Sequence, residues 1–431
     1  MRYSVGIDLG STTTKAVILD EEGRVRGRGI TNSRSNYDVA CEVALTEAQI
    51  AVRFSVVEAA LARRGVAAER QAAQVEALQR AFREQQYRGE LVVLKDVIGG
   101  LLESLHADTE QTRAVLGILD TMDTETRELY GPKSTRKSDF FRDIAGSRYL
   151  TLAEACSRDG GPPFEALAGL FDKAILDVEN TPSAEGGFET FALDAAHHMD
   201  EPIPELEDAV NEALATPLEQ ISSVGTGYGR ARLPFDEGHI RSEILCHGLG
   251  AHAMFPGTRT VLDIGGQDTK AIQVDGEGIV TSFQMNDRCA AGCGRYLGYI
   301  ADEMNLGLHE LGPLAQQSHR PARINSTCTV FAGAELRDRL SLGEKREDIL
   351  AGLHRAIILR AMSLLARSGG VSDEFTFTGG VARNPAAVDA LAGLVKDNYG
   401  DVTLNISPDS IYTGALGAAL YAWRGAALAV A

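Results

Sequence analysis

The feature that most constrains the fold is a motif that occurs twice in the chain. Each copy has an apolar run, an aspartate, a glycine turn, hydroxyl residues, a lysine and a second apolar run. The first copy spans residues 3–20, with Asp8 and Lys15, and the second spans residues 260–274. Short apolar runs separated by glycine turns are typical of β-hairpins. A repeated hairpin predicts two related halves that close on one ligand.

The turns of both hairpins contain the residue types that bind phosphate. Glycine and hydroxyl residues in a tight turn expose backbone N–H groups to an anion, and the lysine adds positive charge. The aspartate can hold Mg²⁺ through water, because magnesium prefers oxygen ligands and keeps much of its hydration. Either hairpin alone would be an ordinary glycine turn.

Together the two hairpins predict a site for one nucleotide with Mg²⁺. Gln267 or Asp268 is predicted to orient the attacking water. The predicted catalytic residues are Asp8, Asp263, Gln267 and Asp268, and the predicted nucleotide-binding residues of the hairpins are Gly10, Ser11, Thr12, Thr13, Lys15, Gly265 and Gly266.

A third glycine turn follows the strand-like segment 374–378 and contains Gly379, Gly380 and Asn384. Missing side chains there let a nucleoside lie against the backbone. The three elements, in this order, resemble the phosphate-1, phosphate-2 and adenosine motifs of the actin, Hsp70 and sugar-kinase superfamily. The resemblance implies an α/β fold with two ribonuclease H-like lobes.

The composition divides the chain into four segments. From about residue 50 to about residue 105 glycine becomes sparse and Ala, Glu, Arg, Gln and Leu dominate, with Val75, Leu78 and Phe82 on one helical stripe. We interpret 46–210 as a mainly helical insertion. The expected order is therefore 1–45 as the first part of lobe I, 46–210 as the insertion, 211–258 as the remainder of lobe I, and 259–431 as lobe II.

Two cysteines, Cys289 and Cys328, each follow residues that commonly cap a helix. A thiol at a helix start feels the positive end of the helix dipole, which favours the thiolate that binds metal clusters. Two thiolates are half of the four that a 4Fe-4S cluster normally takes, so a second subunit would supply the other pair. The alternative is that both are small buried packing residues.

Other cysteines and histidines carry weaker signals. Cys293 lies four residues after Cys289, on the same face of the expected helix, and we interpret it as a packing residue in a helix interior. The spacing of Cys246, His247 and His252 matches no standard zinc pattern, which favours core packing. The adjacent histidines His197 and His198 are expected at the surface rather than at a metal, because neighbouring residues of a helix point in different directions.

Composition and charge limit the classes of binding partner and the cellular compartment that we expect for this chain. A net charge of −18 and a pI near 5.0 speak against nucleic acid and anionic membranes. Six cysteines in 431 residues do not form a secreted disulfide framework, and the N-terminus enters a strand pattern without a signal peptide. We expect a cytoplasmic protein whose apolar segment 414–431 forms a packed helix rather than a membrane span.

The complete motif order is similar to that of the BadF/BcrA-type ATPase family over residues 1–45 and 211–431. The motifs are the first hairpin, Thr-Gly-Tyr-Gly-Arg at 226–230, Asp-Ile-Gly-Gly-Gln-Asp-Thr-Lys at 263–270, Asn-Asp-Arg-Cys-Ala-Ala-Gly at 286–292 and Cys-Thr-Val-Phe-Ala at 328–332. The resemblance implies a 4Fe-4S cluster shared between two ATPase subunits, with Cys289 and Cys328 as ligands. It also implies that ATP hydrolysis drives a low-potential electron from ferredoxin to separate catalytic subunits.

The long insertion departs from the compact homodimeric members and looks like the longer ATPase subunit of benzoyl-CoA reductase. The resemblance then implies a shorter homologous ATPase subunit that shares the cluster, two catalytic reductase subunits, and a heterotetramer acting in anaerobic aromatic degradation. An activator of a 2-hydroxyacyl-CoA dehydratase and a small-molecule kinase of the same superfamily are the alternatives. An actin- or Hsp70-like assembly protein would need no cluster.

Overall fold

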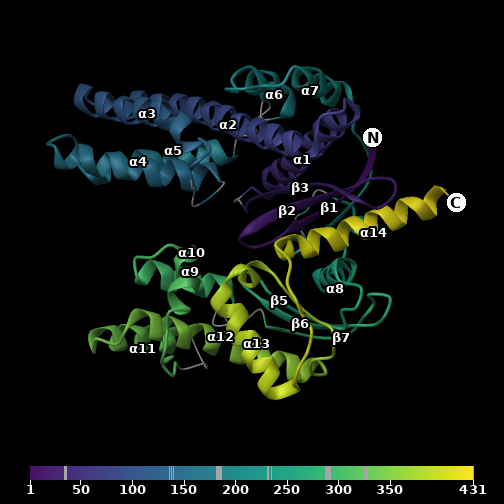
Figure 1. Cartoon of the computed structure of the whole chain (residues 1–431). Coiled ribbons are helices and arrows are strands. Elements are labelled where there is room, and N and C mark those ends of the chain that lie inside the picture. Colours follow the sequence, from purple (N-terminus) through teal and green to yellow (C-terminus); the bar gives the residue numbers. More distant parts are fainter. Residues whose placement is uncertain are drawn as a thin grey trace. The chain divides into compact units, whose positions relative to one another are not determined.

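The computed structural model describes residues 1–33, 36–134, 136, 138, 140–180, 187–230, 233, 235–286, 293–324 and 329–430. The chain divides into two compact units. Figure 1 shows its helices and strands, coloured along the sequence. The first contains Met1 and Val25–Glu219, and the second contains Arg2–Arg24 and Gln220–Ala431. Cys289 and Cys328 lie outside the described residues.

The described part of the first unit is one strand followed by helices. Its elements are β3 (Val25–Asn32), α1 (Tyr37–Arg63), α2 (Ala68–Ser104), α3 (Thr109–Leu129), α4 (Phe141–Arg158), α5 (Phe164–Asn180), α6 (Phe188–His197) and α7 (Glu205–Ala215). The boundaries predicted at 45/46 and 210/211 fall inside α1 and α7. The assignment of these segments to lobes stays a prediction.

Helix α1 packs closely on β3 because glycines leave room for its backbone. A Cβ atom on Gly29 would lie 2.0 Å from the carbonyl oxygen of Ala44, and one on Gly27 would lie 2.2 Å from that of Ala48. Asn36 begins the helix, because its side chain accepts the backbone N–H of Asp38 at 3.1 Å. Local sequence therefore fixes both the start of α1 and the face of β3 that it covers.

The stripe predicted on α2 is confirmed: Val75, Leu78 and Phe82 are all buried. The ring of Phe82 lies 5.4 Å from the Phe54 ring in an edge contact and 5.7 Å from the Phe188 ring in a stacked one. This aromatic cluster joins α1, α2 and α6 in one apolar core of the unit. A separate core is formed by α2, α3, α4 and α5.

Replacing Phe82 with alanine is expected to destabilise the first unit by roughly 3–5 kcal/mol, because it leaves a cavity in a packed core. The measurement is urea unfolding followed by circular dichroism. Val92→Ala on the same helix is the control, since Val92 is 59% exposed and its truncation should change the free energy of unfolding by about 0.5 kcal/mol or less. Equal effects of the two changes would contradict this assignment of the core.

The second unit contains strands from both ends of the chain. Its strands are β1 (Arg2–Leu9), β2 (Thr13–Leu19), β4 (Glu219–Thr226), β5 (Thr260–Ile264), β6 (Thr269–Val274), β7 (Val280–Asn286), β8 (Phe375–Thr378) and β9 (Leu404–Asn405). Strand β1 lies between β2 and β4 in one sheet, and the other sheet has the order β7-β6-β5-β8-β9. Both predicted hairpins are confirmed, as the antiparallel pairs β1/β2 and β5/β6.

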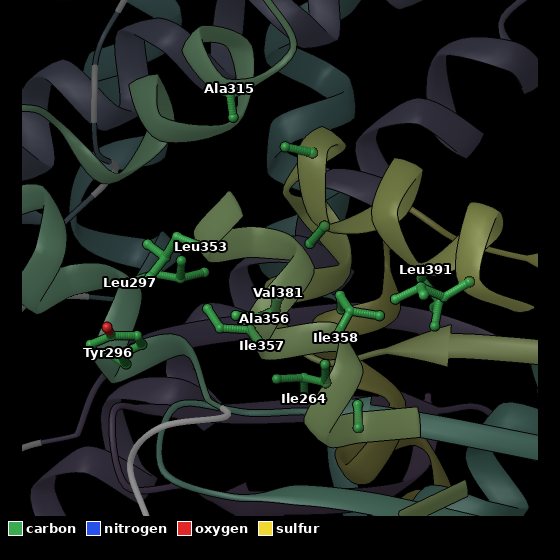
Figure 2. Packing of buried hydrophobic residues seen from close by; sticks show 14 of the residues in the cluster. Ile264, Tyr296, Leu297, Ala315, Leu353, Ala356, Ile357, Ile358, Val381 and Leu391 are labelled. Atoms are coloured by element: carbon green, nitrogen blue, oxygen red, sulfur yellow. The ribbon is translucent and has the colours of Figure 1, made fainter. Parts of the chain in front are cut away.

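The α-helices of this unit are α8 (Glu243–Met254), α9 (Gly294–Glu303), α10 (Leu308–Ala315), α11 (Thr329–Ser341), α12 (Arg346–Ser368), α13 (Pro385–Tyr399) and α14 (Thr413–Val430). Short 3₁₀ turns are η2 (Glu237–His239), η4 (Gly380–Arg383) and η5 (Ser410–Tyr412). Leu262 and Ile264 of β5 belong to the core formed with α9, α10, α12 and α13 (Figure 2). Val261 instead packs with Ile244 of α8, so β5 is covered on both faces.

The predicted packing of the C-terminal segment is confirmed, because α14 covers β1 and α8. A Cβ atom on Gly6 of β1 would lie 2.1 Å from the backbone nitrogen of Ala419, and one on Gly417 would lie 1.8 Å from the carbonyl oxygen of Cys246. Only glycine permits such close approach of backbones. Helix α14 is therefore held tightly against both β1 and α8.

Helix α12 is the one helix in the described part of the chain that is long and apolar enough to cross a membrane. Of that apolar window, 67% is buried inside the second unit. Core helices pass the same test, so this is weak evidence for a span.

Candidate functional site

The strand register of the second sheet places three polar side chains in one row. Asp263 lies opposite Lys270 on the antiparallel strand β6 and opposite Thr378 on the parallel strand β8. Residues opposite each other share a face of the sheet. Since Leu262 and Ile264 face the large core, the alternation of β5 turns Asp263 toward α8.

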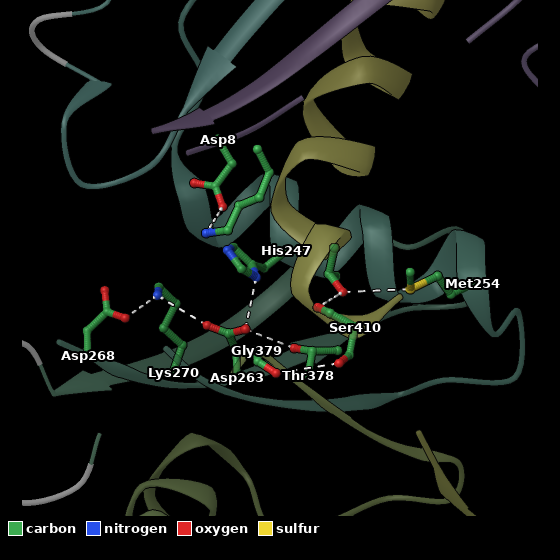
Figure 3. A network of polar contacts seen from close by, with 11 residues as sticks. Asp8, His247, Met254, Asp263, Asp268, Lys270, Thr378, Gly379 and Ser410 are labelled. Carbon is green, nitrogen blue, oxygen red and sulfur yellow. Dashed lines mark hydrogen bonds and ion pairs between the residues drawn. The ribbon is translucent and has the colours of Figure 1, made fainter. Parts of the chain in front are cut away.

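These side chains contact one another (Figure 3). The Oδ2 atom of Asp263 lies 3.3 Å from Lys270 Nζ, and Thr378 Oγ1 donates to Asp263 Oδ1 at 3.0 Å. Lys270 Nζ also lies 2.7 Å from Asp268 Oδ1. The site therefore has a buried lysine shared by two carboxylates.

The first hairpin repeats the arrangement with fewer partners. Asp8 lies opposite Lys15 in the β1/β2 ladder, and Asp8 Oδ2 is 3.4 Å from Lys15 Nζ. The two turns also approach each other, because a Cβ atom on Gly266 would lie 2.2 Å from Thr12 Oγ1. The sequence repeat is therefore a structural repeat, and both copies face one region of the second unit.

His247 of α8 lies where the two hairpins converge. Its Nδ1 atom is 3.2 Å from Asp263 Oδ1. At the start of α14, a Cβ atom on Gly414 would lie 2.7 Å from His247 Nε2 and 3.1 Å from Asp8 Oδ2. The imidazole of His247 therefore contacts Asp263 of the second hairpin. His247 and Asp8 of the first hairpin both lie next to Gly414.

Burial and charge act against each other in this cluster. Burial favours the neutral form of Asp263, but His247 and Lys270 outweigh it and hold the pKa of that carboxyl well below its ordinary value. Burial opposes the charged imidazole, yet Asp263 raises the pKa of His247. Burial likewise opposes the charge on Lys270, and Asp263 with Asp268 raises its pKa. Asp263 and Lys270 are therefore charged at neutral pH.

Glu243 is a further buried carboxyl on the same helix as His247, one turn earlier. Only 6% of Glu243 is exposed, and burial raises the pKa of its carboxyl. Lys270 opposes that shift electrostatically. Glu243 therefore adds a carboxyl of raised pKa next to the Lys270 cluster.

The donor set fits a nucleotide with Mg²⁺. Three aspartates, Asp8, Asp263 and Asp268, stand against two lysines in the hairpins, and oxygen donors suit magnesium. Within the described residues, no three His, Cys, Asp or Glu side chains are arranged to hold a metal ion by themselves. Magnesium bound with nucleotide commonly takes one or two carboxylates, phosphate oxygens and water, so such a trio is not required.

The third glycine turn lies beside the second hairpin. Gly379 has φ = +85°, and a Cβ atom there would lie 2.4 Å from the carbonyl oxygen of Ile264. A Cβ atom on Gly380 would meet nothing within 4 Å. Asn384 ends the turn and begins α13, because its side chain accepts the backbone N–H of Ala386 at 3.1 Å.

The remaining predicted turn residues are partly open to solvent: Thr12 is exposed, while Gly10, Ser11, Thr13, Gly265, Gly266 and Gln267 are half-buried. Asp268 is buried in its pair with Lys270. Their roles in binding or hydrolysis stay predictions.

The interpretation of Cys293 as a residue inside a helix is wrong. Cys293 has φ = −133° and ψ = 170° and stands at the N-cap of α9, which begins at Gly294. The N–H groups of Gly294 and Arg295 each donate at 2.8 Å to the carbonyl oxygens of Gly265 and Gly266. The turn between β5 and β6 therefore determines where α9 begins, which no local helix signal reveals.

The packing interpretation of the histidines and cysteines is correct in part. Cys246 is fully buried against Val224 and the α14 alanines, and His197 and His198 are exposed. His247, by contrast, belongs to the polar cluster, and sequence reasoning missed it together with Thr378. The available signal was the spacing of Glu243 and His247, which places two polar residues on one face of an apolar helix.

Gly227, in the loop after β4, supports the position of Asp8. It has φ = +101°, and a Cβ atom there would lie 2.5 Å from both Asp8 Oδ1 and the carbonyl oxygen of Leu9. Gly227→Ala is expected to destabilise the second unit by roughly 1–3 kcal/mol. Because it displaces Asp8, it should also lower the ATP hydrolysis predicted from the sequence about tenfold to a hundredfold.

The checks are urea unfolding and an ATPase assay. Gly238→Ala in the same loop region is the matched control, since a Cβ atom there meets nothing within 4 Å. Wild-type stability and turnover in Gly227→Ala would show that the loop does not position Asp8.

Comparisons with known proteins point to one group. A family model described as the BadF/BadG/BcrA/BcrD ATPase family matches residues 5–422. The activator of lactoyl-CoA dehydratase from Anaerotignum propionicum is 43% identical over 220 residues, which are 51% of this chain and 82% of that protein. One of the subunits of benzoyl-CoA reductase from Thauera aromatica is 32% identical over 227 residues, covering 51% of this chain and 79% of that protein.

The fold is also similar to a solved structure. Component A of (R)-2-hydroxyglutaryl-CoA dehydratase from Acidaminococcus fermentans matches with a TM-score of 0.55 and 25% identity, covering 99% of this chain and 100% of that one.

Proposed function

This chain belongs to the BadF/BadG/BcrA/BcrD ATPase family, and on that basis we propose that it hydrolyses ATP to drive low-potential electron transfer to a separate acyl-CoA-converting enzyme. The predicted fold class is confirmed: a two-lobed α/β ATPase of the actin, Hsp70 and sugar-kinase type with a mainly helical insertion. The observation that carries the proposal is the convergence of the Asp8 and Asp263 hairpins on α8.

In the proposed site, the phosphates of ATP lie against the two hairpin turns. Lys15 and Lys270 hold positive charge near them, while Asp8 and Asp263 orient the water bound to Mg²⁺. Gln267 or Asp268 orients the attacking water. The adenosine lies at the turn of Gly379, Gly380 and Asn384.

We propose Cys289 and Cys328 as the ligands of a 4Fe-4S cluster shared with a second ATPase subunit. Support comes from the family match, whose relatives include dehydratase activators and a reductase component. Cys328 lies outside the described residues, and its position before a helix stays a prediction from its sequence neighbours Ser326 and Thr327. When bound, the cluster supplies a one-electron carrier of low potential.

Two acceptors remain as candidates. The long helical segment favours the predicted role in benzoyl-CoA reductase, alongside a shorter homologous subunit, two catalytic subunits and ferredoxin. The identities favour an activator of a 2-hydroxyacyl-CoA dehydratase, because the lactoyl-CoA dehydratase activator is 43% identical and the benzoyl-CoA reductase component 32%.

Anaerobic purification of the native complex separates the two acceptors. Copurifying reductase subunits that consume benzoyl-CoA with ATP would establish the first, and a dehydratase that gains activity only with this chain and ATP would establish the second. A colourless protein that phosphorylates a small hydroxyl compound would instead identify a kinase and overturn the proposal.

The coupling itself predicts that nucleotide changes the midpoint potential of the cluster. Binding free energies are reciprocal, so a nucleotide that changes the cluster's redox equilibrium must itself bind differently to the two redox states. Such couplings are typically about 1–3 kcal/mol. Each tenfold change in the redox equilibrium corresponds to about 59 mV for one electron. The measurement is a redox titration with a non-hydrolysable ATP analogue, with ADP and without nucleotide. Gln267→Ala should slow hydrolysis and leave the shift largely intact. Identical potentials in all three states would refute the coupling.

A further inference from the structure

His354 lies in the interior of the second unit, where a histidine needs a reason to be present. It is on α12 and only 1% exposed. Its Nδ1 atom lies 2.7 Å from the carbonyl oxygen of Leu350, and its Nε2 atom lies 3.0 Å from Asn384 Nδ2. Both ring nitrogens are therefore engaged, one within the helix and one with the residue that ends the third glycine turn.

These contacts fix the tautomer of the imidazole. A carbonyl oxygen only accepts, so Nδ1 must carry the hydrogen that it donates to Leu350. Nε2 then has a free lone pair and accepts a hydrogen from the amide of Asn384. Burial lowers the pKa of His354, which keeps the ring neutral and preserves this acceptor.

The amide of Asn384 is fixed in turn. Its Oδ1 atom accepts the backbone N–H groups of Ala386 and Ala387 at 3.1 and 3.3 Å, so its NH₂ group must face His354. Gly312 of α10 closes another side, because a Cβ atom there would lie 2.7 Å from Asn384 Oδ1. One N–H of the Asn384 amide is donated to His354 Nε2. Asn384 is half-buried at the end of the turn, so its second N–H is the one that can face a ligand.

We propose that His354 is a positioning residue for nucleotide binding: it holds the Asn384 amide so that the second N–H of that amide is donated to the nucleoside of ATP or ADP. This rests on the proposed ATPase function. His354 itself does not touch the nucleotide. It acts on Asn384: together with the backbone N–H groups of Ala386 and Ala387, it disfavours the flipped orientation of the amide, in which an oxygen would face its lone pair.

Two amide substitutions that differ by one methylene form the matched pair. The side chain of His354→Gln is long enough to accept from Asn384, whereas that of His354→Asn reaches only the Leu350 carbonyl oxygen. In the full-length chain, His354→Asn is expected to weaken ADP binding about fivefold to tenfold, the worth of one hydrogen bond. His354→Gln should bind ADP almost as the wild type does. Binding is measured by equilibrium dialysis of ADP with Mg²⁺.

Kinetics and a double mutant test whether the effect passes through Asn384. His354→Asn should raise the KM for ATP with little change in kcat, because ground state and transition state lose the same contact. In Asn384→Ala the orientation no longer matters, so adding His354→Asn should weaken ADP binding no further. Additive losses, or equal ADP binding by His354→Asn and the wild type, would overturn the proposal.

Thermal unfolding identifies a purely structural effect, which would lower stability in both backgrounds without changing ADP affinity. If His354→Asn does not fold, His354→Leu takes its place with the same expected losses. If the wild-type chain itself binds neither ATP nor ADP, the proposed function fails, and that outcome is distinct from wild-type binding that is insensitive to His354.

Discussion

Replacing Cys289 or Cys328 with alanine is expected to remove the iron-sulfur cluster entirely. Each subunit would supply two of the four thiolates, so one missing ligand per chain leaves the cluster with too few. In a complex with a homologous partner, one thiolate of this chain and the partner's pair would remain, which is one ligand short of the four. The measurements are iron content and the EPR signal of the dithionite-reduced protein, both on anaerobically purified complex.

The other cysteines provide the controls. Cys156→Ala changes a half-buried thiol on α4 of the first unit and should leave the iron content unchanged. Cys246→Ser and Cys293→Ser are also expected to retain the cluster. Cys293 is the sharper comparison, because it is buried at the N-cap of α9. Loss of iron in Cys293→Ser with full iron in Cys289→Ala would move the ligand assignment from Cys289 to Cys293.

Asp8→Asn and Asp263→Asn are each expected to lower Mg²⁺-dependent ATP hydrolysis by about a hundredfold or more, as when one electrostatic group is removed from an active site. Asparagine keeps the size of the side chain and one acceptor oxygen but removes the negative charge. The loss of hydrolysis should be larger for Asp263→Asn, because this change also removes the negative charge that balances Lys270 and His247.

Both variants should retain iron, because we propose that the Mg²⁺ site and the cluster site are separate. The assay is phosphate release at saturating Mg²⁺, with iron content measured on the same samples. Asp275→Asn is the control: this carboxylate accepts the backbone N–H groups of Glu277 and Ile279, each at 2.9 Å, in the β6/β7 turn. Variants that lose iron yet keep turnover would reverse the proposed roles.

Much of the second unit follows from local sequence. Apolar runs with β-branched residues on either side of glycine turns are enough to predict β1, β2, β5 and β6, because hairpin pairing needs only neighbouring residues. The Asp8/Lys15 and Asp263/Lys270 pairs could be predicted as repeats for the same reason. Their contact with α8 could not, since it depends on which face of each strand the helices cover.

The misassigned residues show the same limit. Cys293 belongs to a stretch that suggests a helix, and its place at the N-cap is set by hydrogen bonds from Gly294 and Arg295 to the carbonyl oxygens of residues 265 and 266. His247 has an apolar neighbourhood in sequence, and its partner Asp263 is distant in the chain. Both outcomes depend on long-range contacts that carry no local pattern.

The repeated hairpins, the helical composition of residues 46–210 and the family resemblance could be predicted before folding was known, because each depends on short-range periodicity or on motifs in a given order. The folded chain was needed to find that Asp263, Lys270, Thr378 and His247 share one buried cluster, and that His354 contacts Asn384. Strand alternation and register turn distant residues toward one face, and close glycine contacts such as Gly417 against Cys246 bring α8 and α14 together.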